Sequence, residues 1–183
     1  MLQLKFFGLG GQGVVTAAKM LSHAVSLCEN KFAITVPSYG HERRGAPVYT
    51  SIIIDAKPVL LNCFVYEPDI VLAMDDALMD KGIDVSQGKK ATSILILNSG
   101  DSEKIAAYKK LNFAKMYCVD GTQIALKHIG RNIPNGSMLG ALACTGIVKI
   151  DSIESAIMDH FGPKAGKTNG AAAREAYENI TNA

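Results

Sequence analysis

A strand, a glycine turn and a helix follow one another near the start of the chain, and this succession constrains the fold more than any other segment. Residues 2–7 form a largely apolar run that stops at Gly8, as a β-strand would. Apolar side chains then recur at helical spacing from Val14 to Leu27. Residues 8–13 read GLGGQG, a GxGxxG pattern with a strand before it and a helix after it. The chain is therefore predicted to begin with the first βα unit of an α/β sheet.

Strand-like and helix-like segments alternate along the rest of the chain. Further strands are predicted at residues 32–36, 47–54, 69–74, 93–97 and 116–119. Further helices are predicted at residues 122–128, 137–147, 153–161 and 169–180. This alternation predicts an α/β, three-layer Rossmann-like domain with a mostly parallel sheet and a C-terminal helical cap. Residues 162–167 read as a linker too short to separate domains, so residues 1–183 are expected to form a single domain.

Composition narrows the classes of function. Nineteen Lys and Arg against seventeen Asp and Glu leave a net charge of +2, which does not suit a nucleic-acid-binding protein. Charged residues make up only 20% of the chain, so part of the surface is expected to be covered by a partner. The sequence has no apolar run long enough to span a membrane and no signal-peptide pattern, and a cytoplasmic location is expected.

The four cysteines do not form a recognisable motif. Cys28, Cys63, Cys118 and Cys144 are widely separated, without a CxxC pair. Zinc sites, iron–sulfur sites and dithiol redox centres usually begin with such a pair. The cysteines are therefore expected to be reduced and mostly buried.

The glycine pattern has a functional and a structural interpretation. Glycines allow the backbone to approach a ligand, and the free N–H groups of the first helical turn bind phosphate oxygens. Alternatively, the same glycines only allow a helix and a strand to pack closely. A dinucleotide site also needs an acid at the end of the second strand, where the sequence has Thr35-Val36-Pro37-Ser38. A Walker-type site needs Gly-Lys-Ser/Thr at the end of the loop, which is also missing, so NAD binding and ATP hydrolysis are not supported.

A charged loop follows the second predicted strand. Residues 38–47, SYGHERRGAP, place an aromatic ring, an imidazole, a carboxylate and two guanidinium groups within ten residues. Arginine is the side chain best suited to bidentate capture of phosphate or carboxylate, so the loop is a candidate anion site. The alternative is a solvated surface loop with an internal Glu–Arg pair.

These two blocks, together with residues 130–138, GRNIPNGSM, resemble the gamma subunit of 2-oxoacid:ferredoxin oxidoreductases, and the similarity extends over nearly the whole chain. The wording of residues 42–47, ERRGAP, is closest to the pyruvate and ketoisovalerate type. The resemblance implies a complex that oxidatively decarboxylates a 2-oxoacid, pyruvate being favoured, to acyl-CoA with ferredoxin as electron acceptor. It implies that thiamine diphosphate and iron–sulfur clusters are held by partner subunits, because no motif for either is found in this chain.

The resemblance also implies that this subunit holds no cofactor of its own, helps to bind coenzyme A and supports assembly, and is inactive alone. No catalytic or metal-binding residue is expected. The residues carried over as candidates for coenzyme A binding are Gly8, Gly10, Gly11, Gln12, Gly13, Ser38, Arg43, Arg44, Arg131 and Asn135. For Arg131 and Asn135 the alternative is purely local, because Asn-Ile-Pro-Asn-Gly is turn chemistry that can serve only to start a helix. The competing interpretation of the whole chain is a free-standing Rossmann-like protein that binds a nucleotide or small anion.

Overall fold

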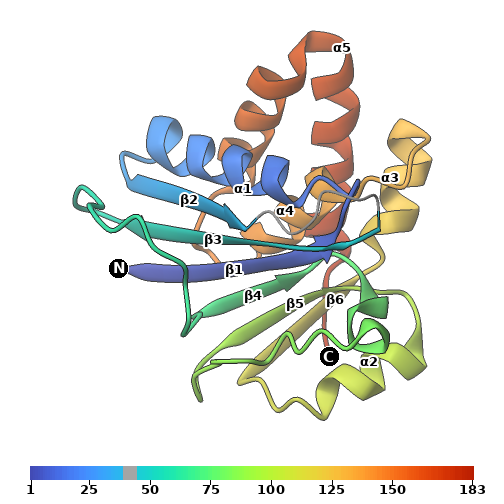
Figure 1. The fold of residues 1–183 in the computed structure, drawn as a ribbon. Helices are drawn as coiled ribbons and strands as arrows, with labels where there is room; N and C mark the ends of the chain where they lie inside the picture. Colours follow the sequence, from blue (N-terminus) through green and yellow to red (C-terminus); the bar gives the residue numbers. More distant parts are fainter. Residues whose placement is uncertain (39–44) are drawn as a thin grey trace.

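The computed structural model describes residues 1–38 and 45–183 and contains one mixed sheet with helices on both faces (Figure 1). The first half of the chain comprises β1 (Leu2–Leu9), α1 (Val14–His23), the π-helical η1 (Ala24–Cys28), β2 (Phe32–Ser38), β3 (Pro47–Asp55), β4 (Ile70–Ala73) and the 3-10 helix η2 (Asp76–Lys81). The second half comprises β5 (Ile94–Asn98), α2 (Ser102–Lys109), β6 (Lys115–Val119), α3 (Gly121–Ile129), α4 (Asn135–Ala143), α5 (Ile150–Asn179) and β7 (Thr181–Asn182).

The described strands follow the order β2-β3-β1-β4-β5-β6-β7 across the sheet. Pairing is parallel from β1 through β4 and β5 to β6. It is antiparallel on both sides of this centre, where β3 joins β1 and β2 joins β3, and where β7 joins β6. All four residues of β4 are buried, as expected for a parallel strand with both faces covered. The predicted α/β class is confirmed, with a sheet that is parallel in its centre and antiparallel at its edges.

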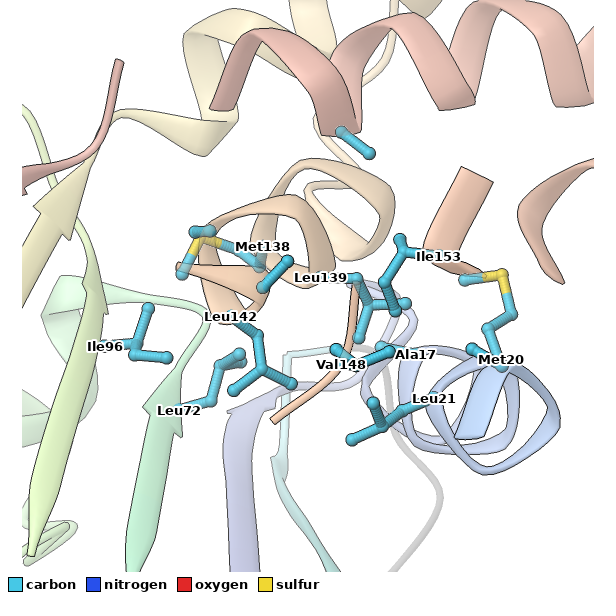
Figure 2. Packing of buried hydrophobic residues seen from close by; sticks show 14 of the residues in the cluster. Ala17, Met20, Leu21, Leu72, Ile96, Met138, Leu139, Leu142, Val148 and Ile153 are labelled. Atoms are coloured by element: carbon cyan, nitrogen blue, oxygen red, sulfur yellow. The ribbon is translucent and has the colours of Figure 1, made fainter. Parts of the chain in front are cut away.

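Two hydrophobic clusters lie on opposite faces of the sheet. The larger one joins the sheet to α1, α3, α4 and α5, and all nine residues of α4 are buried. Figure 2 shows Met138, Leu139 and Leu142 of α4 between the strands that carry Leu72 and Ile96 and the helix α1. The smaller cluster covers β4, β5 and β6 with side chains from η2, α2 and the segments beside them. This arrangement forms the predicted three layers.

The predicted linker at residues 162–167 is wrong. The structure continues helically from Ile150 to Asn179, and only Gly162, at φ 73° and ψ 177°, departs from helical geometry. Pro163 follows at once, and proline suits the first position of a helix because it needs no N–H partner there. The segment is therefore a sharp bend between two helical arms, which Figure 1 shows side by side as the C-terminal cap.

The expectation that the cysteines are mostly buried is also wrong. Cys118 on β6 is buried and Cys144 is half-buried, whereas Cys28 and Cys63 are exposed. Cys28 ends η1 at the surface, and Cys63 lies in the connection between β3 and β4. The apolar character of cysteine alone does not predict burial at a helix end or in a surface loop.

Candidate functional site

A crevice opens where the parallel strands β1, β4, β5 and β6 end. In open α/β sheets, ligands bind outside the carboxyl ends of the strands. The crevice has a volume of about 430 Å³. It is lined by Gln12, Asp75, Asp76, Asn98, Ser99, Gly100, Asp101, Asp120, Thr122, Gln123 and Asn132. Gln12 comes from the glycine loop and Asn132 from the GRNIPNGSM block, so two of the three sequence blocks meet here.

The carboxylates of the crevice start the helices that follow the strands. Asp75 accepts a hydrogen bond from the N–H of Ala77 at 2.9 Å, and Asp120 accepts one from the N–H of Gln123 at 2.9 Å. Asp101 caps α2 in the same manner. These bonds satisfy helical N–H groups that would otherwise lack a partner. Among the described residues, no group of three or more His, Cys, Asp or Glu side chains is arranged to hold a metal ion. The carboxylates also make the crevice unfavourable for phosphate.

Asn98 links three elements at the floor of the crevice. Its amide donates to the carbonyl oxygen of Met74 at 2.8 Å and to the hydroxyl of Thr122 at 2.9 Å, and its carbonyl oxygen accepts from the N–H of Thr122 at 3.2 Å. The sequence pattern placed Asn98 at a strand end but did not identify it as part of a site. The sequence feature that could have identified Asn98 as a site residue is that polar residues follow several of the buried parallel strands directly.

Two glycines of the glycine loop are required for packing. A Cβ atom on Gly8 would lie 2.6 Å from Cγ2 of Val14, and a Cβ atom on Gly13 would lie 2.5 Å from the amide nitrogen of Asn135. Gly13 also has a φ of 78°, a left-handed conformation that other residues adopt at a cost. The packing interpretation therefore accounts for Gly8 and Gly13 without a ligand.

The outer part of the loop is tied to the charged block. The N–H of Gly10 donates to the carbonyl oxygen of Ala46 at 2.8 Å, and the N–H of Gly45 donates to the carbonyl oxygen of Gly10 at 3.1 Å. Gly11 is exposed with a φ of 101°. Gln12 accepts from the N–H of Leu9 at 2.8 Å and donates to Asp75 at 2.5 Å. The glycine loop is thus fixed between the crevice and the C-terminal flank of the charged block.

Helix α1 begins directly after Gly13, the last residue of the glycine loop. Among the residues that the structure describes, no side chain caps this helix, and its first turn contains no acidic residue. Its first N–H groups and the positive end of its dipole therefore lie next to Gly13, where Val14 itself is only 3% exposed.

The other predicted residues occupy different surroundings. Ser38 ends β2 opposite Tyr49. Arg131 is exposed in the connection between α3 and α4. Asn135 is only 3% exposed and accepts from the N–H of Gly136 at 2.8 Å. Arg43 and Arg44 lie outside the described residues. The structure thus brings Asn135 against the glycine loop as a packing partner at the start of α4.

Comparison of the sequence with known proteins identifies the family of this chain. The model of the pyruvate ferredoxin/flavodoxin oxidoreductase family matches residues 3–179. The chain belongs to this family. Within the pyruvate ferredoxin/flavodoxin oxidoreductase family, the common gamma subunit of the pyruvate/ketoisovalerate oxidoreductases of Thermococcus litoralis is 46% identical, over 97% of this chain and 96% of that protein. The pyruvate synthase subunit PorC of Methanocaldococcus jannaschii is 40% identical over 98% of this chain and 97% of that protein.

A solved structure in the pyruvate ferredoxin/flavodoxin oxidoreductase family has the same fold. The pyruvate oxidoreductase subunit PORC of Thermotoga maritima superposes with a TM-score of 0.85 and 34% identity, covering 100% of this chain and 98% of that one. These matches confirm the resemblance to gamma or PorC-type subunits. Among the helices that the structure describes, none combines the length and apolar character needed to cross a membrane.

Proposed function

We propose that this chain is the non-redox gamma subunit of a complex that oxidatively decarboxylates a 2-oxoacid, pyruvate being favoured, to acyl-CoA with ferredoxin as acceptor. The observation that carries the proposal is the near full-length match to subunits named for pyruvate synthase and for pyruvate/ketoisovalerate oxidoreductase. Thiamine diphosphate and the iron–sulfur clusters then belong to the sister subunits. The scattered positions of the four cysteines support this division, because they lie on separate parts of the fold.

Within the complex, the chain contributes to coenzyme A binding at the outer side of the glycine loop. The crevice carboxylates would repel the phosphates of coenzyme A, whereas the uncapped start of α1 attracts them. The hydrogen bonds from Gly10 to Ala46 and from Gly45 to Gly10 keep the flank of the charged block beside this helix start. Arg43 and Arg44 belong to that block, and their guanidinium groups are the proposed phosphate ligands.

The test is the double variant Arg43→Ala with Arg44→Ala in the assembled complex. Each hydrogen bond between a charged guanidinium and a phosphate contributes about 1.5–3 kcal/mol. Loss of one such contact should raise the apparent Michaelis constant for coenzyme A about tenfold or more, with 2-oxoacid decarboxylation nearly unchanged. The matched control is Lys109→Ala with Lys110→Ala, which removes two adjacent exposed cations at the end of α2.

Three outcomes are informative. An intact complex with unchanged dependence on coenzyme A would refute the arginine assignment. Loss of the gamma chain from the complex, together with every partial reaction, would mean that the arginines serve assembly. Reduction of ferredoxin by the purified chain alone, given a 2-oxoacid, coenzyme A and thiamine diphosphate, would refute the subunit proposal as a whole.

A further inference from the structure

One face of the antiparallel half of the sheet is not covered by a helix of the described chain. The register places Lys5, Ser51 and Val36 side by side on β1, β3 and β2, and cross-strand partners share a face. Thr35, the neighbour of Val36, points to the other face, where its hydroxyl approaches the carbonyl oxygen of Ala18 in α1. The cluster beneath η2 and α2 includes no buried residue of β2 or β3. Lys5 and its neighbours therefore lie on the face that no described helix covers, although Ser51 is buried there.

The connection between β3 and β4 crosses this face and exposes apolar side chains. Val65 is buried, and its N–H donates to the hydroxyl of Ser51 at 2.9 Å, which fixes the connection to the sheet. Around it, Leu60 is 90% exposed, Leu61 49% and Tyr66 73%. We refer to residues 60–66 as the apolar loop. Apolar side chains exposed together in one loop are typical of interaction sites in folded proteins.

A cleft lies between the apolar loop and η2, and we name it the Lys5 cleft. Its volume is about 690 Å³. Its lining includes the aromatic side chains of Phe7, Tyr49, Phe64 and Tyr66, together with Leu78 of η2. The rings of Phe7, Tyr49 and Phe64 form a series with centroids 6.3 Å and 6.1 Å apart. Aromatic walls of this type are typical of the central part of protein interfaces.

Lys5 supplies a cation to the cleft. Its ammonium lies 5.1 Å from the ring centroid of Phe7 and 5.1 Å from that of Tyr49. Within residues 1–38 and 45–183, none of the ion pairs involves Lys5. Burial lowers the pKa of Lys5, because removal of water disfavours the charged form. A carboxylate placed against this ammonium would restore the lost stabilisation of the charge.

The carboxylates already in the cleft do not fill that position. Glu67 and Asp84 line it, and both are exposed. Asp84 accepts from the N–H of Ser86 at 2.9 Å and from its hydroxyl at 2.6 Å. The cleft therefore combines a half-buried cation that has no ion-pair partner in residues 1–38 and 45–183, an aromatic wall, and carboxylates that lie at the surface.

We propose that the Lys5 cleft and the apolar loop dock a sister subunit of the complex, which places an acidic side chain against the Lys5 ammonium and apolar side chains against residues 60–66. This proposal rests on the proposed function, because it requires sister subunits. Charge complementarity determines the chemistry of the partner segment, an acidic residue flanked by apolar ones. The aromatic wall and the exposed leucines supply the apolar contact area.

The first test uses the co-expressed complex with Lys5→Met, Lys5→Glu and Lys5→Arg. Methionine keeps the apolar stem and removes the charge. Removal of one partner of a desolvated charge pair should weaken binding of the gamma chain roughly 30-fold or more. Lys5→Glu should weaken it further, and Lys5→Arg should retain most of the affinity. Lys109→Met, an exposed lysine on α2, is the control. Dissociation is measured by sedimentation, and the fold of each variant is checked by circular dichroism.

The second test needs no variant of Lys5. Cys63 lies within the apolar loop and is exposed, and Cys28 is exposed on η1. The alkylation rate of Cys63 therefore reports whether the apolar loop is covered, and that of Cys28 serves as the reference. In the wild-type complex, alkylation of Cys63 should slow at least tenfold relative to the free chain, measured against Cys28 by mass spectrometry of each peptide.

The outcomes separate this proposal from the proposed function. An intact complex in which Cys63 keeps its free rate and Lys5→Glu binds normally would overturn the docking proposal and leave the subunit assignment standing. Protection of Cys63 in the isolated chain through self-association that Lys5→Met abolishes would mean that the occupant is a second copy, which also overturns it. Failure of the wild-type chain to associate with any thiamine-binding or cluster-bearing subunit would refute the proposed function itself.

Discussion

Helix α4 contacts the backbone of α5 at Gly140. Substitution of Gly140 therefore tests how closely the two helices pack. A Cβ atom on Gly140 would lie 1.9 Å from the carbonyl oxygen of Ala173, whereas real Cβ contacts essentially never fall below 3.0 Å. In Gly140→Ala the two helices must therefore separate by about 1 Å, and both faces are buried. Overpacking of this kind costs about 1–3 kcal/mol, and more where backbone must move. The gain in helix propensity offsets about 1 kcal/mol. Because the obstructing atoms of Ala173 are backbone, the cost lies at the upper end, about 3 kcal/mol, and the net loss is expected to be about 2 kcal/mol.

The same substitution at a second glycine of the cap should have the opposite sign. A Cβ atom on Gly170 in α5 would meet only Cγ of Glu154, at 3.9 Å, an ordinary contact. Gly170→Ala should therefore stabilise the chain by about 0.5–1 kcal/mol through its helix propensity. Urea unfolding gives both values, and Gly140→Ala should also lower the melting temperature by about 4–8 °C. A Gly140→Ala variant as stable as the wild type would refute the close approach of α4 and α5.

Two further predictions concern titration. The hydrogen bonds from Lys127 and His128 lower the pKa of Glu175 from its ordinary value of 4.5, so the stability that this carboxylate contributes is complete above that value and is lost as the pH falls below it. Glu175→Gln should therefore lower the urea midpoint at about pH 7 and change it little at about pH 2. Burial raises the pKa of Cys118 and of Cys144 to about 11, so iodoacetamide at about pH 8 should modify both far more slowly than the two exposed cysteines, and equal rates seen by mass spectrometry would contradict the burial.

The elements of the fold are predictable from sequence where the pattern is local. The strand before Gly8, the helix after Gly13 and the buried strand at residues 70–73 follow from spacing alone. The position of β3 between β2 and β1 is set by pairing over long distances, which periodicity does not report. The sequence does not distinguish the bend at Gly162 from a linker, because Gly-Pro occurs both where a helix ends and where the chain only turns between two helical arms.

The candidate site is predictable only in part, because its residues act for different reasons. The glycine pattern correctly identified the turn, but packing against Val14 and Asn135 requires two of its glycines, and no sequence pattern distinguishes packing from ligand contact. The crevice carboxylates belong to separate βα units that meet only through the parallel sheet. Lys5 was missed because a lone cation in a strand carries no motif, and its aromatic neighbours come from other strands.

The two halves of the sheet also differ in how far apart along the chain their partners lie. Strands β2 and β3 form an antiparallel pair, whereas β1 must find a partner much later in the chain, as the bond from the N–H of Gln3 to Asp69 across 66 positions illustrates. Closing a long loop costs conformational entropy before the contacts between its ends contribute any stabilisation. We therefore expect the β2–β3 pair to form early during folding. The parallel strands should form more slowly and join this pair through β1.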